Sequence, residues 1–458
     1  MCGICAAIGF KKASRVVYDL ALGLQHRGYE CAGIAAVNNN HIRARKKRGT
    51  LDQVFYKKRT LEKLIGDIAI GHIRYSTSGG KHQATADAQP ITTSRTAFAH
   101  NGTITNALLL RSELEENGYQ FQTPGSDSEV IPKLVSASKE KTVGKKFLDA
   151  LSVVEGAYSF ASIWKDNLVL ARDPYGYRPL SIGQVNGGYV ACSEQLALEN
   201  IAATNIREVE KGELIVINQS GLESYSISKE IQGQQCIMEC IYFARPDSVI
   251  FGMKAPTMAY RYQTGQQLAK EDNIKADLVV PVLDSGLPAA LGYSHESGIK
   301  LQLGLLRNRV SGRTFILPDQ DARVAAVNAK HSPISWVVNG KSVIVPDDSL
   351  IRGTTSRGIV RMLKDAGATE VHFRVASPPT TGPCFYGLDT PSKEELIATG
   401  RSVEDIRDYI EADSLKFLSL EGLKVPLAQP QNFCYACFDG NYANNLSKSQ
   451  LNVLSNKS

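Results

Sequence analysis

Two patterns of hydrophobic and polar residues divide the 458-residue chain. Up to about residue 230, short runs of the β-strand type predominate, separated by glycine, asparagine and aspartate. Few helical patterns intervene, one of which is NALLLRSELEENG at 106–118. We therefore expect an α+β half built on antiparallel sheets. Its strand candidates are DIAIGHIRYS, RTAFAHNGTI, AYSFASIW, NLVLARDP and ELIVINQS.

From about residue 275 the pattern changes to continuous apolar strands that alternate with helices. ADLVVPVLDSG, SVIVPDDS and EVHFRVASPP are typical of buried strands, whereas PAALGYSHESG and TTSRGIVRMLKDAG predict helices. This alternation indicates a parallel sheet with ligand sites at the ends of its strands. The length also exceeds that of one ordinary core. We expect two domains, 1–230 and 231–458.

The composition is that of a soluble globular protein, with 43% hydrophobic and 21% charged residues. No apolar run approaches the ~18 residues of a membrane span, and no secretory signal is present. We therefore expect a cytoplasmic protein without a membrane partner. The net charge of +6 is spread along the chain, which suits a small anionic substrate. The densest basic stretch, RARKKRG at 43–49, predicts a solvated hairpin tip rather than a nucleic-acid site.

The stretch VIVPDDSLIRGTTS at 343–356 carries the strongest chemical motif. An apolar strand leads to two aspartates, Asp347 and Asp348, and then to Arg-Gly-Thr-Thr at the start of a helix. Backbone N–H groups and threonine hydroxyls at a helix start can surround a phosphate. The carboxylates can hold a ribose diol or a hydrated Mg²⁺. The alternative is a capped helix after a solvated turn.

This stretch resembles the phosphoribosyl pyrophosphate (PRPP) motif of the phosphoribosyltransferases. The resemblance implies that the acidic pair holds the ribose hydroxyls and that an earlier loop binds pyrophosphate. It also implies a mobile flap at 307–333 and a Mg²⁺ ion held by Ser285, Asp347 and Asp348. The implied PRPP-binding residues are Asp284, Ser285, Gly286, Asp347, Asp348, Arg352, Gly353, Thr354 and Thr355.

The chain opens with MCGICAAIGF, which places Cys2 directly behind the initiator methionine. Once Met1 is removed, the α-amino group of Cys2, with a reference pKa of ~7.7 to 8, can act as general base for its own thiol. One residue then supplies both nucleophile and base. This interpretation requires that Met1 be absent from the active protein.

Further motifs of the first half resemble, in order and spacing, the N-terminal-nucleophile glutamine amidotransferases. The two halves together resemble the glutamine PRPP amidotransferase family over nearly the whole chain. The implied fold is an α+β N-terminal-nucleophile (αββα sandwich) glutaminase domain plus an α/β phosphoribosyltransferase type I domain. The matching motifs are LQHRGYECAGIA, GHIRYSTSG, AHNGTITN, GSDSEV, ARDPYGYRPL, YFARPDSVIFG and YGLDTPSKEELIATGRSVEDI.

The resemblance also implies roles for individual residues of the first half. Cys2 attacks the glutamine carboxamide, while the Asn101 side chain and the Gly102 N–H form the oxyanion hole. Arg74 binds the α-carboxylate and Asp127 the α-ammonium group, which matches the charges of an amino-acid zwitterion. Thr77 is implied to lie nearby, and Arg27 on a loop that covers the thioester.

Nine cysteines in an intracellular chain do not indicate a disulfide framework. The spacing of Cys434 and Cys437 is typical of ligands to zinc or an iron-sulfur cluster. Together with Cys236 and Cys384, they resemble the ligands of the family branch that carries a [4Fe-4S] cluster of structural role. A zinc site and four buried thiols remain as alternatives. We expect the unpatterned cysteines to be small core residues: Cys5, Cys31, Cys192 and Cys240.

The resemblance implies synthesis of 5-phosphoribosylamine from glutamine and PRPP, the first committed step of purine synthesis. It also implies a homo-oligomer, dimeric or tetrameric, with purine nucleotides as feedback inhibitors. One alternative is the same glutaminase with another acceptor, and a second is a regulator that senses PRPP without catalysis.

Several positions depart from the family pattern. Cluster-bearing relatives usually carry a short propeptide before the cysteine, where this chain has Met1 alone. Departures that bear on ligand binding are Tyr29, Cys31, Val310, Asn328 and Pro346, and we expect the two in the flap, Val310 and Asn328, to alter PRPP binding or nucleotide inhibition.

Overall fold

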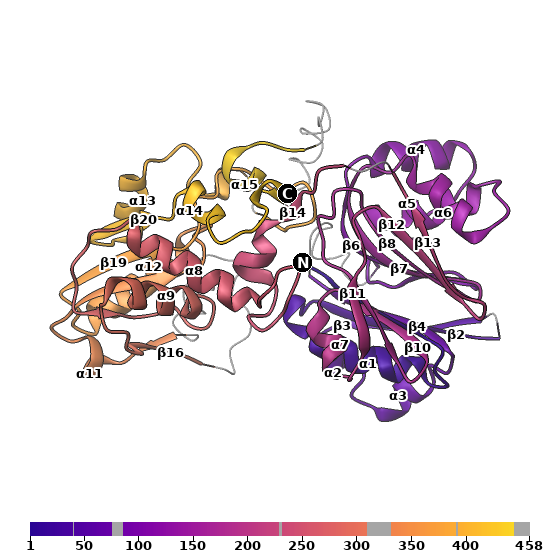
Figure 1. The fold of residues 1–458 in the computed structure, drawn as a ribbon, viewed down its shortest axis with the longest axis horizontal. Helices are drawn as coiled ribbons and strands as arrows, with labels where there is room; N and C mark the ends of the chain where they lie inside the picture. Colours follow the sequence, from indigo (N-terminus) through magenta and orange to yellow (C-terminus); the bar gives the residue numbers. More distant parts are fainter. Residues whose placement is uncertain (40, 76–85, 229–230, 309–330, 391–392, 444–458) are drawn as a thin grey trace.

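The computed structural model of the chain describes residues 1–39, 41–75, 86–228, 231–308, 331–390 and 393–443. Figure 1 shows two lobes, with the indigo-to-magenta strands in one and the orange and yellow strands in the other. The N-terminus lies between them. The residues that follow Met1 are therefore placed where the two lobes meet.

The first lobe is built on two antiparallel sheets, of seven and six strands in the described part of the chain. The order in the first sheet is β11 (Thr204–Glu208), β9 (Ser181–Val185), β10 (Gly188–Cys192), β1 (Gly3–Ile8), β4 (Ile68–Arg74), β2 (Cys31–Asn38) and β3 (His41–Arg48). The order in the second is β13 (Gly221–Ser226), β12 (Glu213–Asn218), β8 (Asn167–Arg172), β7 (Gly156–Trp164), β6 (Thr96–Ile104) and β5 (Ile91–Thr92).

Side chains of β1 alternate between two hydrophobic layers, as the two-residue period of a strand requires. Ile4 and Ala6 pack between the two sheets, against residues such as Ala161 of β7. Cys5 and Ala7 face the opposite way, toward helices that cover the first sheet. The lobe is therefore a helix–sheet–sheet–helix sandwich, which confirms the fold predicted from sequence.

Helices cover the outer face of each sheet. Those against the first sheet are α1 (Ala13–Gly23), α2 (Leu51–Val54) and α7 (Gln195–Glu199), with α3 (Lys58–Glu62) following α2 along the chain. Those against the second are α4 (Ala107–Glu116), α5 (Val130–Ala137) and α6 (Val143–Leu151).

The second lobe contains a parallel sheet in the order β15 (Leu278–Val279), β18 (Ser342–Asp347), β19 (Glu370–Val375) and β20 (Ser414–Phe417). Both faces are covered, because Ile344 belongs to one buried cluster and its neighbours Val343 and Val345 to another. The covering helices are α8 (Thr257–Lys270), α9 (Leu287–Ser297), α12 (Thr354–Asp365), α13 (Val403–Ile410) and α14 (Leu420–Lys424). The α/β prediction is confirmed.

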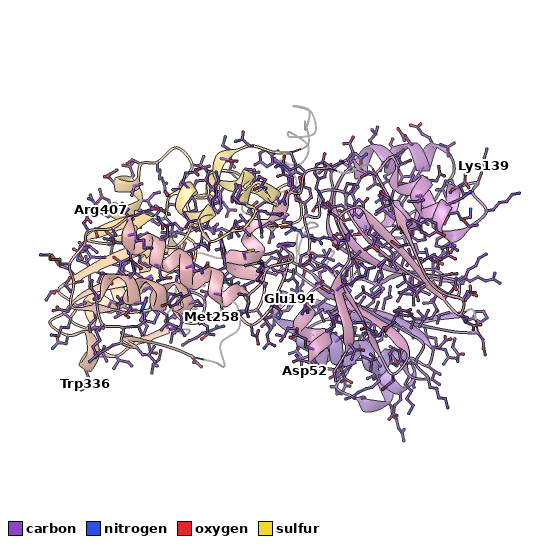
Figure 2. All side chains as sticks on the ribbon, viewed as in Figure 1. Asp52, Lys139, Glu194, Met258, Trp336 and Arg407 are labelled. Atoms are coloured by element: carbon purple, nitrogen blue, oxygen red, sulfur yellow. The ribbon has the colours of Figure 1, made fainter. Side chains whose placement is uncertain are left out.

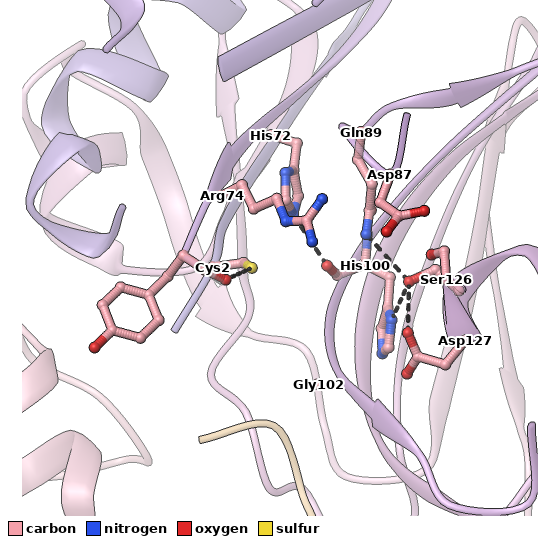
Figure 3. Close-up of a pocket in the computed structure, with 11 residues that line it drawn as sticks. Cys2, His72, Arg74, Asp87, Gln89, His100, Gly102, Ser126 and Asp127 are labelled. Carbon is pink, nitrogen blue, oxygen red and sulfur yellow. Dashed lines mark hydrogen bonds between the residues drawn. The ribbon is translucent and has the colours of Figure 1, made fainter. Parts of the chain in front are cut away.

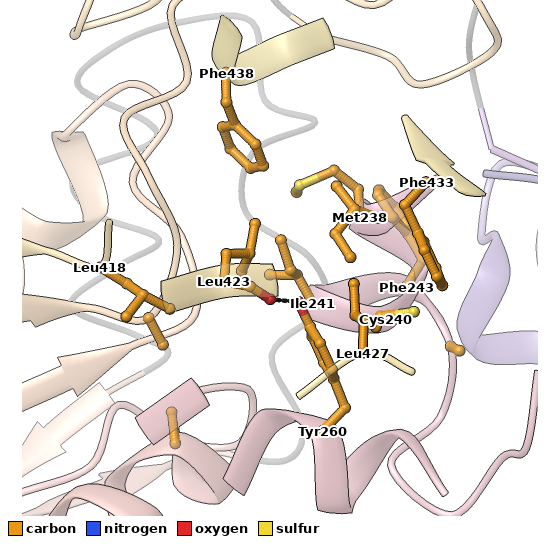
Figure 4. Packing of buried hydrophobic residues seen from close by; sticks show 14 of the residues in the cluster. Met238, Cys240, Ile241, Phe243, Tyr260, Leu418, Leu423, Leu427, Phe433 and Phe438 are labelled. Carbon is orange, nitrogen blue, oxygen red and sulfur yellow. Dashed lines mark hydrogen bonds between the residues drawn. The ribbon is translucent and has the colours of Figure 1, made fainter. Parts of the chain in front are cut away.

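Figure 4 shows part of a buried cluster that lies mainly in the second lobe. Within it, the Tyr260 hydroxyl donates a hydrogen bond to the carbonyl oxygen of Leu423 at 3.0 Å. The same cluster contains Met1 and Ile344. It therefore extends from the N-terminus to the strand that ends in the acidic pair.

Several short elements connect or cap these layers. They are β14 (Gln235–Cys236), β21 (Phe433–Cys434), β16 (Leu305–Arg307), β17 (His331–Pro333), α11 (Ser335–Val338), α15 (Ala436–Asp439), the single-turn helices η1 (Gln25–Arg27), η2 (Asp127–Glu129), η5 (Lys393–Glu395) and η6 (Pro430–Asn432), and the π-helix η3 (Glu239–Phe243). β14 pairs with β21, and β16 pairs with β17.

The structure corrects one local prediction. The basic stretch 43–49 is not a hairpin tip, because all but its last residue belong to β3, which pairs with β2 along its length. β3 is an edge strand, and positive charges on an edge strand discourage pairing with another chain.

One other prediction is confirmed, because the four cysteines assigned to the core are buried. All nine cysteines are free. Among the described residues, no helix is long and apolar enough to cross a membrane.

Candidate functional site

Cys2 lies immediately before β1, the strand at the centre of the first sheet. Its side chain is buried, with 7% exposed, and its thiol donates to the carbonyl oxygen of Tyr75 at 3.5 Å. Figure 3 shows Cys2 at one side of a pocket and Asp127 at the other. The residues that line this pocket are Cys2, His72, Arg74, Tyr75, Asp87, Gln89, His100, Gly102, Ser126, Asp127 and Ser128.

Asn101 and Gly102 belong to β6 and lie beside Cys2. The backbone N–H of Cys2 donates to Oδ1 of Asn101 at 3.2 Å. Because an N–H can donate only to the amide oxygen, the Nδ2 group of Asn101 faces away; it is buried and has no hydrogen-bond partner among the described residues. Such an unused donor costs free energy unless a ligand accepts from it. It is therefore suited to receive an oxygen that becomes negatively charged.

Gly102 has a backbone conformation that favours glycine, with φ at +144°. A Cβ atom at this position would lie 2.0 Å from the carbonyl oxygen of Ala157. A side chain therefore does not fit there. The glycine allows the strand to pass close to its neighbour while Gly102 itself lines the pocket.

Arg74 and Asp127 bring opposite charges to the same pocket. Arg74 ends β4 and forms an ion pair with Glu30 at 3.4 Å. The Asp127 carboxylate accepts hydrogen bonds from the Ile104 N–H at 2.8 Å and from the Ser128 hydroxyl at 3.3 Å. A cation and an anion in one pocket match the two charged groups of a free amino acid.

Two histidines of this pocket escaped the sequence analysis. His72 lies two residues before Arg74 on β4, and the strand period puts both side chains on one face. Burial, helped by the charge of Arg74, lowers the pKa of His72 to about 3, so this imidazole is neutral. His100 precedes Asn101 and hydrogen-bonds to the Ser128 hydroxyl at 2.8 Å. Strand alternation could have predicted both histidines, because His72 lies two residues before Arg74 on β4 and His100 two residues before Gly102 on β6.

Arg27 lies behind Cys2 rather than over it. It is fully buried on η1, and its Nε donates to the carbonyl oxygen of Cys2 at 2.9 Å. Its other nitrogens donate to Glu194 and Glu239, each at 2.6 Å at the shortest. Figure 2 shows Glu194 at the junction of the lobes. The structure thus does not place Arg27 on a covering loop, and Thr77 lies outside the described residues.

The acidic pair ends the central strand β18 of the parallel sheet. Asp347 and Asp348 are 7% and 6% exposed, and the Asp348 N–H donates to Asp347 Oδ1 at 2.9 Å. Gly286 packs against this strand end, because a Cβ atom there would lie 2.5 Å from the Pro346 carbonyl oxygen. The structure therefore brings the 284–286 loop beside the acidic pair. Asp284 forms an ion pair with Arg307 of β16.

The Arg-Gly-Thr-Thr stretch forms the start of α12, which begins at Thr354. Gly353 precedes it with φ at +74°, a conformation that favours glycine. Arg352 pairs with Glu395 at 3.5 Å. The N–H groups of Thr354 and Thr355 belong to the first turn of a twelve-residue helix, where no intrahelical partner is available. Most of the predicted flap, with Val310 and Asn328, lies outside the described residues.

The four patterned cysteines come together at the junction from three separate segments. Cys236 and Cys434 are register partners in the parallel pair of β14 and β21. The Cys437 carbonyl accepts from the N–H groups of Thr381 and Gly382, close to Cys384. Burial raises the pKa of the Cys437 thiol, and the thiols of Cys434, Cys236 and Cys384 raise it further.

The described residues contain no group of three or more His, Cys, Asp or Glu side chains arranged to hold a single metal ion. A single ion bonds each sulfur at about 2.3 Å and so needs the sulfurs in mutual contact. A four-iron cluster places iron and sulfide between its four thiolates and therefore needs them farther apart. Cys236 and Cys437 are buried and Cys384 and Cys434 are half-buried, and the four come from converging segments.

Fold and pocket together define the class: an N-terminal-nucleophile glutamine amidotransferase joined to a sheet of the phosphoribosyltransferase kind. The glutamine amidotransferase domain family matches residues 72–200. The amidophosphoribosyltransferase of Bacillus subtilis is 44% identical over 451 residues, covering 96% of this chain and 94% of the relative. The chain therefore belongs to the amidophosphoribosyltransferase family.

Solved structures agree with this assignment. The glutamine PRPP amidotransferase of B. subtilis complexed with ADP and GMP superposes with a TM-score of 0.89 and 42% identity, covering 97% of this chain and 98% of that one. A structure described as the allosteric regulatory enzyme of purine biosynthesis gives a TM-score of 0.90 and 42% identity, covering 98% and 97% of the two chains.

Proposed function

We propose that this enzyme converts glutamine, PRPP and water to 5-phosphoribosylamine, glutamate and pyrophosphate, the first committed step of de novo purine synthesis. The observation that carries the proposal is one pocket that joins the Cys2 thiol to the Asn101–Gly102 peptide and to the charges of Arg74 and Asp127. We assign the two half-reactions to two units, residues 1–230 and 231–458.

In the first half-reaction, the Cys2 thiolate attacks the glutamine carboxamide carbon. The oxyanion that forms accepts from Asn101 Nδ2 and the Gly102 N–H, ammonia leaves, and water hydrolyses the thioester to glutamate. Arg74 binds the α-carboxylate and Asp127 the α-ammonium group. We assign Thr77 to the same pocket, and to Arg27 the role of fixing the Cys2 carbonyl.

The base for the Cys2 thiol is its own amino group, so the reaction requires that Met1 be removed. Met1 is fully buried here, and burial lowers the pKa of the terminal ammonium group well below its ordinary value. The space that Met1 occupies is continuous with the apolar cluster that reaches Ile344.

In the second half-reaction, ammonia attacks C1 of PRPP and displaces pyrophosphate with inversion. Asp347 and Asp348 bind the ribose hydroxyls. The pyrophosphate loop consists of Asp284, Ser285 and Gly286, and the 5-phosphate loop of Arg352, Gly353, Thr354 and Thr355. Ammonia reaches this site through the apolar interior, which protects it from protonation by bulk water.

Two metal groups complete the proposal. Ser285, Asp347 and Asp348 would hold Mg²⁺, because hydroxyl and carboxylate oxygens are its preferred ligands. When bound, the ion neutralises charge on pyrophosphate.

Cys236, Cys384, Cys434 and Cys437 would hold a [4Fe-4S] cluster of structural role. Arg178 supports this assignment: it is fully buried, and among the described residues its Nη1 has no hydrogen-bond partner. Burial opposes its charge, yet Cys236 and Cys384 raise the pKa of its guanidinium. Four iron and four sulfide per chain are expected in anaerobically purified protein, whereas stoichiometric zinc or metal-free thiols would refute the cluster.

The remaining features follow from the family. We propose a cytoplasmic homo-oligomer, dimeric or tetrameric, that purine nucleotides inhibit, supported by the ADP and GMP in the B. subtilis structure. Nucleic acid and membranes are not expected partners. The acidic pair followed by Arg-Gly-Thr-Thr disfavours another acceptor, and the intact Cys2, Asn101 and Gly102 disfavour a regulator without catalysis.

The direct test mixes the purified protein with glutamine, PRPP and Mg²⁺ and follows glutamate and pyrophosphate together. The proposal predicts that both form in equal amounts. Glutamate without pyrophosphate would instead favour another acceptor, and neither product would favour a regulator.

A further inference from the structure

A segment of the second half of the chain lies directly against Gly102 of the first half, at the Cα and carbonyl group of that residue. Gly387 has φ at +100°, a conformation that favours glycine. A Cβ atom at Gly387 would lie 2.7 Å from both Cα and the carbonyl carbon of Gly102. The two glycine backbones are therefore in contact without a side chain between them. A Cβ atom at Gly102 would in turn lie 2.0 Å from the carbonyl oxygen of Ala157.

Hydrogen bonds fix the segment 383–390 that carries Gly387. The Cys384 N–H donates to the Thr390 hydroxyl at 2.7 Å, which closes the segment into a loop. The Tyr442 hydroxyl donates to the Pro383 carbonyl at 2.6 Å. The loop therefore has a defined shape at its base, where Cys384 lies.

The first half of the chain also holds this loop. The Tyr386 ring stacks on Tyr177 with centroids 4.3 Å apart and an angle of 20° between the rings. Both rings are almost fully buried. Arg178 donates to the Tyr386 carbonyl through Nη2 at 2.5 Å and Nε at 3.2 Å. Gly387 comes directly after this anchored residue, so its position against Gly102 is set from both halves.

We propose that the segment 383–390 is the outer wall of the oxyanion hole and that Gly387 is a positioning residue for the Gly102 N–H. The inference rests on the function proposed above. The glutaminase site is then incomplete without the second half of the chain. Only glycine serves at 387, because a methyl group would push the Gly102 backbone away from the place where the oxyanion forms.

The test is Gly387→Ala in the full-length protein. A displaced oxyanion donor lowers kcat, and removal of one such donor costs about 10² to 10³-fold. We expect kcat with glutamine to fall at least about tenfold while KM for glutamine changes little. Formation of 5-phosphoribosylamine from high ammonium and PRPP should stay at the wild-type level, because that reaction bypasses Cys2.

A binding measurement separates the oxyanion hole from the rest of the pocket. Glutamate γ-semialdehyde forms a hemithioacetal with Cys2, and its oxygen occupies the oxyanion position. Gly387→Ala should weaken binding of this aldehyde by the same factor by which it lowers kcat, and it should leave the affinity for glutamate unchanged. Equal weakening of the binding of both ligands would overturn the proposal.

Gly400→Ala is the matched control, since Gly400 has φ at +69° but no atom within 4 Å of its Cβ position. It should keep full glutamine-dependent activity. Gly387→Ala that behaves like this control, or that loses both activities together, would overturn the inference. If Gly387→Ala does not fold, Tyr386→Ala should give the same selective loss, and wild-type behaviour of that variant would also overturn it. Failure of the proposed function is distinct, because the wild-type protein would then lack glutamine-dependent activity.

Discussion

The backbone N–H of Cys2 donates to Oδ1 of Asn101 at 3.2 Å, which leaves the Asn101 Nδ2 group buried and unpartnered within the described structure. One side chain thus both holds the nucleophile's backbone and offers a donor to the reacting oxygen. The two residues are 99 positions apart in the sequence. Their contact joins the first strand of one sheet to the second sheet of the sandwich.

Asn101→Ala should lower kcat with glutamine by about 10² to 10³-fold, because it removes one preorganised oxyanion donor. Ammonia-dependent synthesis should not change. Steady-state assays with glutamine and with ammonium as the nitrogen source measure the two activities separately. Asn117→Ala, at an exposed helix end, is the control and should match the wild type in both assays. Parallel loss of both activities in Asn101→Ala would contradict the assigned role.

Asp127→Asn should raise KM for glutamine, because it removes the negative partner of the α-ammonium group but keeps a hydrogen-bond acceptor for Ile104. Glutaramate, which lacks the amino group, provides the sharper test. The wild type should strongly prefer glutamine, whereas the variant should use both compounds with similar kcat/KM. If the variant still prefers glutamine over glutaramate, the α-ammonium group of glutamine must bind at a residue other than Asp127.

Asp347→Asn should weaken PRPP binding, because the neutral amide is a poorer partner for ribose hydroxyls and Mg²⁺. Glutaminase chemistry at Cys2 does not require this carboxylate. Isothermal titration with PRPP and Mg²⁺ measures the loss, and Asp365→Asn at the far end of α12 is the control. Unchanged PRPP affinity in Asp347→Asn would show that the acidic pair does not bind this substrate.

His72 makes the stability of the fold depend on pH, and the burial of its side chain fixes the sign of this dependence. Its pKa is lowered to about 3, below the ~6.5 of an exposed histidine, so between these values the unfolded chain binds more protons. His72 therefore contributes stability above pH ~6.5, which is lost by about 1.4 kcal/mol per pH unit as the pH falls toward 3.

Thermal unfolding of His72→Gln between pH 4 and 7.5 checks this dependence. The variant should be less stable than the wild type at pH 7.5, and the difference should shrink as the pH falls. His41→Gln on the exposed strand β3 should follow the wild type. A difference that is constant with pH would show that His72 does not titrate as its burial requires.

Local patterns predicted the sheets, because strand alternation and helix amphipathicity follow from residues close in sequence. The same locality explains the failure at 43–49: charge density indicated a turn, but pairing with β2 decided that Arg43 to Arg48 form a strand. Contiguous motifs indicated Cys2 and the acidic pair, and the resemblance added their roles in the family.

Contacts between distant residues could not be predicted in the same way. Arg27 pairs with Glu239 across 212 positions, and Gly387 meets Gly102 from the other half of the chain. These contacts depend on how the two lobes dock, and no periodicity within one segment encodes that.

Cys2→Ala in the presence of PRPP and Mg²⁺ tests the central claim most directly, because it separates the two chemical sites within one chain. The substitution removes the nucleophile but leaves the acidic pair and the phosphate loop intact. We predict that pyrophosphate release with glutamine is abolished and that release with high ammonium continues at the wild-type rate. Loss of both reactions in a variant with an unchanged circular dichroism spectrum, or glutamine use that persists, would contradict the two-site account.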